Sequence, residues 1–171
     1  EHAKQTKLMQ VSPGSTSGNL VPRLALSSVG IPEPEKRFSS VVYGKTHAAT
    51  IDSVANGNAS LAAMGSAEYF SFISKAENKD KVKLVWLSPE IPLGPVLVKK
   101  SHDKNLHQKI ADCLLQLHQQ NDEALQKVKT GWSEAKHAEK YIIITDSYYN
   151  PFRKQLGKKK DLKRILEQFA N

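Results

Sequence analysis

Short apolar runs alternate with segments of helical spacing along the first 88 residues. The apolar runs predict four strands, at residues 7–11, 38–43, 59–64 and 81–87. The segments between them predict three helices, at residues 17–28, 46–57 and 66–76, and a proline-containing loop at residues 31–37. Strands and helices that alternate in this way are typical of an α/β fold with a mainly parallel sheet flanked by helices. We therefore expect this fold class for the first half of the chain.

The pattern changes after Ser88. Residues 88–95, SPEIPLGP, hold three prolines and a glycine, which is typical of a connecting segment or hinge. Beyond the hinge, the sequence predicts a short strand at 96–100 and helices at 103–119, 121–129 and 159–170, whereas residues 141–144 fit either a strand or a helix. The expected organisation is an α/β lobe at residues 1–88, followed at residues 89–171 by the hinge and a helical return to another lobe.

The composition is that of a globular protein with a core. Hydrophobic residues make up 39% of the 171 positions. No stretch approaches the ~18 consecutive apolar residues that a membrane-spanning helix needs. A single cysteine excludes an internal disulfide framework. Cys113 lies in an apolar run of an expected helix, and Trp86 lies in the fourth expected strand, so we expect both side chains in the core.

The formal net charge is +8, and much of it lies in a basic run at residues 153–164. Such a run can bind nucleic acid. Aromatic side chains that could stack on bases are absent from it, and the residues around its end have the spacing of an amphipathic helix. We therefore interpret the run as the solvated basic face of the last helix and expect no nucleic-acid partner.

The first expected strand leads into the first expected helix through PGSTSG, residues 13–18. Ser15, Thr16 and Ser17 offer hydroxyls and backbone N–H groups at a helix start, where the helix dipole favours an anion. Glycines on either side allow a close approach of the backbone. One of these hydroxyls would suffice for an N-cap. Three of them favour an anion site.

The second expected strand is followed by GKTH, residues 44–47. Thr46 is expected to cap the next helix, which places His47 in the first turn of that helix. In an open α/β sheet, ligands bind at the carboxyl ends of the strands. A lone histidine is often structural or solvated, but this position favours a contribution to the same site.

The motifs occur in an order that resembles a known family. The elements are STSGNLVP at residues 15–22, GKTH at 44–47, DSVANGNAS at 52–60, WLSPEIPLGP at 86–95 and the pair Gly131-Trp132. They resemble the phosphonate-binding proteins of ABC importers, in the phosphate, phosphite and phosphonate branch of the type II periplasmic binding proteins. This resemblance implies two α/β lobes joined by a hinge. The chain departs from the family at Ser60, where an aspartate is usual.

The resemblance also implies a ligand and its contacts. Ser15, Thr16 and Ser17 match the family's phosphoryl-oxygen ligands, and His47 matches its histidine ligand. The implied ligand is a phosphonate, phosphite or phosphate, held without a cofactor or a metal ion. The implied partner is the membrane-associated permease of an ABC transporter, and the implied location is the bacterial periplasm or another extracytoplasmic space.

Family members that bind aminoalkyl phosphonates need carboxylates for the ammonium group. Glu68, in the third expected helix, is the candidate by position, although a solvent-exposed role suits it as well. In the hinge, Gly94 stands where a carboxylate is expected, and Glu90 is the nearest acid. These two positions weaken the case for an amine-bearing ligand.

Two further function classes stay open from the residues alone. A sensor domain of the same fold would report the ligand to a signalling partner. A hydrolase would use Ser15 or Ser17 with His47 and Asp52 in a Ser–His–Asp arrangement. The GxSxG sequence of α/β hydrolases is missing, and several hydroxyls at one helix start suit binding better than one activated nucleophile. We therefore expect a binding protein and no enzyme.

The resemblance begins at the second lobe of the family and leaves the other lobe incomplete at its N-terminal side. The helices expected at 103–119 and 159–170 have apolar faces that should pack on a sheet. We expect the chain either to pair with its missing N-terminal segment or with a second copy, or to expose an apolar patch of several hundred Å².

Overall fold

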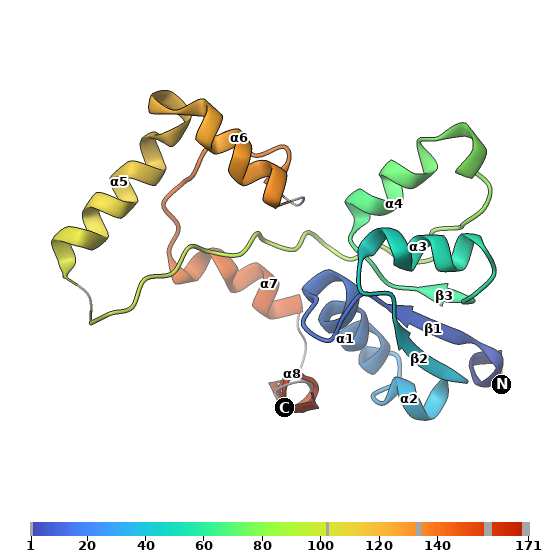
Figure 1. Cartoon of the computed structure of the whole chain (residues 1–171). Helices are drawn as coiled ribbons and strands as arrows, with labels where there is room; N and C mark the ends of the chain where they lie inside the picture. The colour runs from blue at the N-terminus through green and yellow to red at the C-terminus, as the bar shows by residue number, and fades with distance from the viewer. Residues whose placement is uncertain (1, 102, 133–134, 156–158, 169–171) are drawn as a thin grey trace. The chain divides into compact units, whose positions relative to one another are not determined.

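The computed structural model describes residues 2–101, 103–132, 135–155 and 159–168. The chain forms two compact units, drawn in Figure 1. The first unit consists of Glu1–Ile91 with Phe152–Asn171, and the second consists of Pro92–Pro151. From the sequence we expected a division after residue 88, with all of residues 89–171 in one part. The structure instead groups Phe152–Asn171 with the first unit, because α8 (Lys159–Gln168) packs on that unit and buries Ile165, which is 1% exposed.

A three-stranded parallel sheet forms the centre of the first unit. Its strands are β1 (Lys7–Gln10), β2 (Ser40–Tyr43) and β3 (Leu61–Ala62), in the order β2-β1-β3. Leu8 of β1 pairs with Val41 on one side and with Leu61 on the other. These strands confirm the prediction for the first three apolar runs and the mainly parallel sheet.

Helices follow each strand of this sheet, as Figure 1 shows. A π-helical turn, η2 (Thr16–Leu20), leads into α1 (Val21–Ser28) after β1, α3 (His47–Ala55) follows β2, and α4 (Ser66–Ile73) and η3 (Ala76–Asn78) follow β3. These elements confirm the expected helices. The first unit also contains η1 (His2–Gln5) and α2 (Pro34–Arg37). The expectation of a loop at 31–37 was wrong for α2, since a proline at the first helical position has its φ preset for a helix.

The second unit is mainly helical. Its elements are α5 (Lys104–Gln120), α6 (Asp122–Gly131) and η5 (Asp146–Tyr149), and α7 (Asn150–Gln155) begins at its end. Asp103 caps α5 by accepting from the Asn105 N–H, and Asn121 caps α6 by accepting from the Ala124 N–H. The two long helices confirm the predictions for 103–119 and 121–129. Cys113 is exposed, so its expected burial was wrong: its apolar run lies on α5, where Ile110 is exposed as well.

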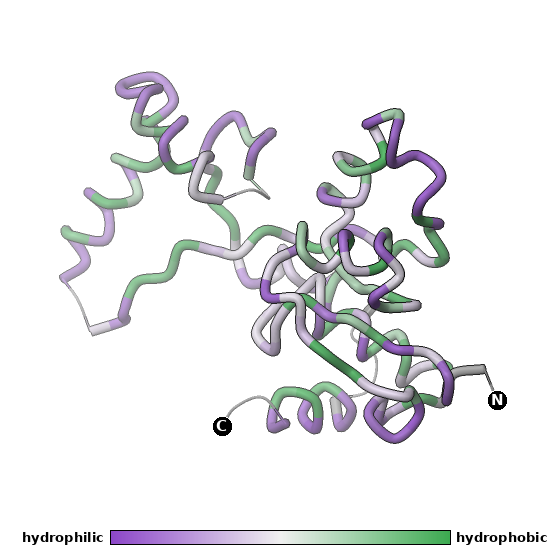
Figure 2. Tube along the Cα trace, turned by 45° about the vertical axis from the view of Figure 1, so that its right-hand side comes forward, coloured by the Kyte–Doolittle hydropathy of each residue, from purple (hydrophilic) through white to green (hydrophobic). Residues whose placement is uncertain are grey.

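Three apolar segments are extended without forming strands. Residues 82–99 and 141–145 contain no strand, so the predictions of strands at 81–87 and 96–100 were wrong, and 141–144 forms neither a strand nor a helix. Figure 2 shows hydrophobic stretches along these segments. Leu97 is 82% exposed and Ile143 is 78% exposed, and Trp86, which we expected in the core, is 51% exposed. An apolar pattern makes a strand only where another backbone offers hydrogen-bond partners.

An ion pair between a buried arginine and a partly exposed glutamate joins several elements of the first unit. Arg23 of α1 is 1% exposed and donates to both carboxylate oxygens of Glu35 in α2, at 3.2 Å from Nη1 and 2.5 Å from Nη2. Burial by itself raises the pKa of Glu35, but the hydrogen bonds that it accepts and the attraction of Arg23 outweigh burial and hold this pKa below its ordinary value. Burial lowers the pKa of Arg23, and its contacts with Glu35 and Tyr43 more than restore it.

We predict that the first unit becomes less stable at acidic pH because the stabilisation from this pair is lost. Because the pKa of Glu35 is lower in the folded than in the unfolded chain, its contribution is present at neutral pH and is lost as the pH falls through the folded-state value. The contribution should be at most about 1 kcal/mol, since the Glu35 side chain is 42% exposed. The measurement is the melting temperature as a function of pH. Between about pH 5 and pH 3 the melting temperature of the wild type should fall by more than that of the Glu35→Gln variant. Parallel curves would contradict the assignment.

Candidate functional site

The carboxyl ends of the three strands meet at one edge of the sheet, because all three are parallel. Backbone hydrogen bonds hold the segments that leave this edge. The Gly44 and Lys45 N–H groups donate to the carbonyls of Gln10 and Val11, at 2.8 and 2.7 Å, and the Ala63 N–H donates to the Met9 carbonyl at 2.9 Å. The turns before α1, α3 and α4 therefore start from the same place. This edge is where an α/β sheet binds its ligands.

The first turn at this edge carries the three hydroxyls. Ser15 has an extended backbone and caps η2: its Oγ accepts from the Gly18 N–H at 3.0 Å. A hydroxyl can accept and donate at once, so this cap leaves the Ser15 O–H proton as a donor. Thr16 is exposed, and Ser17 is half-buried. The turn thus presents hydroxyl donors and backbone N–H groups at the start of a helical segment that continues to Ser28.

Gly18 lets this turn fold back on the end of β1. Its carbonyl accepts from the Val11 N–H at 3.2 Å. A Cβ on Gly18 would lie 2.3 Å from Cγ2 of Val11, closer than real atoms approach. No Cβ can therefore be accommodated without moving the turn, which explains one glycine of the PGSTSG sequence. Gly14 has nothing within 4 Å of its own Cβ position.

The second turn carries His47. Thr46 caps α3 by accepting from the Ala49 N–H at 3.1 Å, as expected, and His47 is the first residue of the helix. Nδ1 of His47 accepts from the Gly65 N–H at 2.9 Å. Because Nδ1 accepts, the neutral ring carries its hydrogen on Nε2. The Gly65 N–H therefore selects the tautomer whose other nitrogen is a hydrogen-bond donor.

The third turn brings the first two together. Gly65 occupies the N-cap position of α4, and the position that its Cβ would occupy lies 3.4 Å from Cε1 of His47 and 3.5 Å from Oγ of Ser17. Ser17 and His47, which are 30 positions apart in the sequence, thus lie around one glycine. We did not single out Gly65 as a partner of His47 from the sequence. The available signal was a glycine between an apolar strand and a helix start.

Glu68 lies in the first turn of α4, three residues beyond Gly65, and is half-buried. The helix that carries Glu68 therefore begins at the same edge of the sheet as the turns with the hydroxyls and His47. Glu90 is exposed in the segment after η3, which forms no helix or strand. Gly94 belongs to the second unit.

Comparison with known proteins identifies the family. A family model described as "ABC transporter, phosphonate, periplasmic substrate-binding protein" matches residues 1–142. The chain belongs to this family. Its members are substrate-binding proteins, so family membership supports a binding protein rather than the Ser–His–Asp hydrolase that included Asp52. The family also implies a location outside the cytoplasm. In the described part of the chain, none of the helices is long and apolar enough to cross a membrane.

A solved structure shows the same fold. The chain is similar to the crystal structure of a binding protein component of an ABC phosphonate transporter from Pseudomonas aeruginosa, at 21% sequence identity and a TM-score of 0.66. The match covers 99% of this chain and 60% of that chain. The family fold is thus present over nearly the whole chain, and the chain spans about three fifths of the length of the protein that it matches.

We predict that Gly18→Ala destabilises the first unit while Gly14→Ala does not. The added methyl group at residue 18 overlaps Val11, and overpacking of this kind costs about 1–3 kcal/mol. The same methyl group at residue 14 meets open space. Urea denaturation of the two variants and the wild type measures the difference. Equal midpoints for the two variants would show that the turn does not pack on Val11 as described.

Proposed function

We propose that this chain forms the oxyanion-binding part of a substrate-binding protein, which captures a phosphonate, phosphite or phosphate for an ABC importer. Membership of the phosphonate-binding family supports the ligand class. The observation that carries the assignment to particular residues is the arrangement around Gly65, since the Ser17 hydroxyl and the His47 ring both lie within 3.5 Å of the position that its Cβ would occupy. On this proposal the ligand contacts are Ser15, Thr16, Ser17 and His47.

Each of these groups donates to an anion in a different way. The hydroxyls of the turn donate O–H groups, and the start of the helical segment adds backbone N–H groups with a favourable dipole. His47 donates from Nε2, because Nδ1 is already occupied by the Gly65 N–H. Hydrogen bonds to a charged acceptor are stronger than those between neutral groups. Such a set of donors stabilises phosphoryl oxygens without a metal ion.

Glu68 is the proposed contact for a substituent on the phosphorus atom. Its place in the first turn of α4 puts a half-buried carboxylate at the edge where the ligand would bind. A carboxylate there can pair with an ammonium group and repels a second anionic group. On this proposal, 2-aminoethylphosphonate binds more tightly than methylphosphonate in the wild type, and Glu68→Gln removes the preference.

The experiment that tests the site is calorimetric titration of the chain with methylphosphonate and inorganic phosphate. His47→Ala and the double variant Thr16→Ala/Ser17→Ala should each reduce the affinity at least about tenfold, since one hydrogen bond to a charged group contributes about 1.5–3 kcal/mol. Ser28→Ala is the matched control. Its hydroxyl also lies on the helical segment but donates to the Ala25 carbonyl at the opposite end.

The control should bind like the wild type, and thermal melts should show that the variants remain folded. His47→Ala leaves the Gly65 N–H without its acceptor, so a small decrease in melting temperature is expected in that variant. Unchanged affinities in both site variants of a chain that binds methylphosphonate would contradict the proposed ligand contacts.

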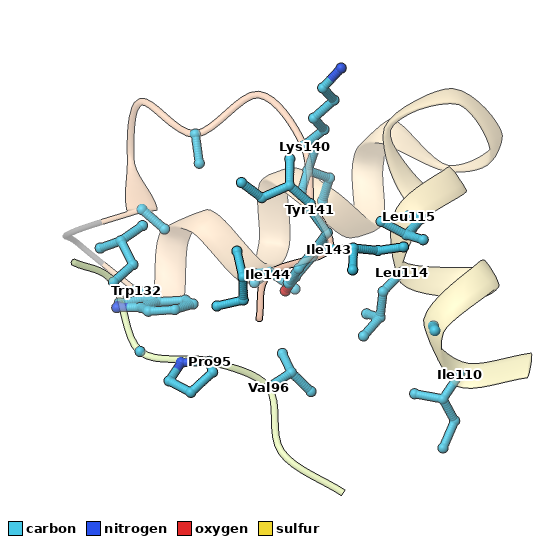
Figure 3. Close-up of a pocket in the computed structure, with 18 of the residues that line it drawn as sticks. Pro95, Val96, Ile110, Leu114, Leu115, Trp132, Lys140, Tyr141, Ile143 and Ile144 are labelled. Atoms are coloured by element: carbon cyan, nitrogen blue, oxygen red, sulfur yellow. The ribbon is translucent and has the colours of Figure 1, made fainter. Parts of the chain in front are cut away.

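The second unit contains an apolar groove, drawn in Figure 3. Its volume is about 410 Å³. The side chains of Leu114 from α5, Trp132 beyond α6, and Val96 and Ile144 from the extended segments point toward the same space. Besides α5 and α6, the groove is bordered by two segments that form no strand, residues 93–98 and 140–144.

We propose that a polypeptide segment covers this groove and pairs with the extended segments as additional β-strands. The proposed occupant is the equivalent of the part of the Pseudomonas aeruginosa structure that has no counterpart in this chain. Leu97 and Ile143 stand highly exposed on the two extended segments, as strand residues do when their partner is absent. The net charge of +8 opposes pairing of two copies of the chain.

We predict that the chain alone binds a dye that reports exposed apolar surface. The double variant Leu97→Ser/Ile143→Ser should reduce the dye signal without a loss of melting temperature, because both side chains are exposed. Val29→Ser is the control, since Val29 is 71% exposed in the first unit. Analytical ultracentrifugation under the same conditions gives the oligomeric state. A monomer without dye binding would contradict the proposal, and a dimer without dye binding would make a second copy the occupant.

A further inference from the structure

Two polar side chains next to the hydroxyl turn are almost completely buried. Asn19 is 0% exposed and Arg23 is 1% exposed. Neither presents surface to a ligand, so neither belongs to the proposed set of ligand contacts. A buried guanidinium is costly unless its donors are paired. The role of these two residues therefore lies in what they hold together.

Asn19 links Arg23 to the beginning of the turn. Nε of Arg23 donates to Oδ1 of Asn19 at 2.8 Å, and Nδ2 of Asn19 donates to the Pro13 carbonyl at 2.7 Å. The first hydrogen bond determines which end of the amide faces Arg23, and it thereby directs the amide N–H toward Pro13. Residues 13–19, which contain all three hydroxyls, are thus closed into a loop by a side chain.

Arg23 is in turn anchored to three other elements. Both terminal nitrogens of its guanidinium pair with Glu35 in α2, while Nη2 also donates to Oε1 of Gln10 in β1 at 3.1 Å and to the Tyr43 hydroxyl in β2 at 3.3 Å. Gln10 and Tyr43 are the last residues of their strands. The guanidinium therefore fixes the position of the turn relative to the carboxyl edge of the sheet.

We propose that Arg23 is a positioning residue for the oxyanion site: it holds Asn19, and through Asn19 the Pro13 carbonyl, so that the turn presents Ser15, Thr16 and Ser17 in one arrangement. This inference rests on the proposed function for its ligand, but the geometry of the turn can be measured without a ligand. An experiment can therefore contradict the positioning role of Arg23 without contradicting the proposed function, and the reverse.

Arg23→Lys tests the proposal with a small change. Lysine keeps a positive charge that can pair with Glu35, but it has a methylene group where arginine has Nε. Asn19 then loses the donor that orients it. The turn should open more often, while the rest of the unit keeps its ion pair.

The readout is amide hydrogen exchange in the full chain without ligand. The Gly18 and Leu20 N–H groups donate to Oγ and to the carbonyl of Ser15, and they report the turn. The Thr50 and Asn56 N–H groups donate within α3 and serve as the reference. In Arg23→Lys the exchange of the turn should accelerate at least tenfold relative to the α3 reference. The affinity for inorganic phosphate should fall at least tenfold.

Phe38→Leu is the matched control for a general loss of stability. Phe38 is buried and lies just before β2, at the amino end of the strand. This variant should accelerate exchange in the turn and in α3 by similar factors. Should Arg23→Lys not fold, Asn19→Asp takes its place: it keeps an acceptor for Nε and loses the donor to Pro13, so it too should loosen the turn selectively.

Equal acceleration in the turn and in α3 for Arg23→Lys or for Asn19→Asp would overturn the proposal and leave the network a purely structural one. Selective loosening of the turn supports the proposal even if the wild type binds no phosphate. In that case the positioning of the turn holds and the proposed function fails.

Discussion

The candidate site depends on the backbone hydrogen bonds at the carboxyl end of β1. The carbonyls of Met9, Gln10 and Val11 accept from the segments that follow β3 and β2. β1 is the central strand, so these hydrogen bonds bring two distant segments to the turn that follows β1 itself. Without them, the hydroxyls at 15–17 and the imidazole at 47 would share no common edge. The backbone thus brings the three turns together, and side-chain contacts then fix the positions of individual groups within them.

Gly65 is the clearest example of this refinement. Its N–H selects the tautomer of His47, and the imidazole and the Ser17 hydroxyl both lie within 3.5 Å of the position that its Cβ would occupy. The buried Arg23 acts from the other side, through Asn19, on the turn that carries the hydroxyls. Groups outside the proposed ligand contacts thus hold the candidate site.

Local patterns predicted most of the first unit because its elements carry their own signals. The apolar runs before PGSTSG and GKTH form strands, and Thr46 caps α3 as its sequence indicates. The placement of the hydroxyls and His47 at the ends of parallel strands also followed from position alone, whereas their role as ligand contacts stays a proposal. The roles of Gly65, Asn19 and Arg23 did not follow from the sequence, since they depend on contacts between residues far apart in the sequence or on a buried network that no motif announces.

The failed strand predictions have a different cause. The runs around Trp86, Leu97 and Ile143 have the composition of strands, but a strand also requires a neighbouring backbone, and these segments have none in the described structure. The apolar side chains of these runs need a partner surface to be buried, and the proposed covering segment would provide one.

The central claim is that an oxyanion binds where Ser17 and His47 meet at Gly65. Its most direct test is a titration of the ¹⁵N-labelled chain with methylphosphonate, followed by nuclear magnetic resonance. The account predicts that the amide signals of Thr16, Ser17 and Gly18 and the Nε2 signal of His47 shift together and saturate at one ligand concentration. Saturable shifts confined to the basic run at 153–164, with those signals unmoved, would contradict it.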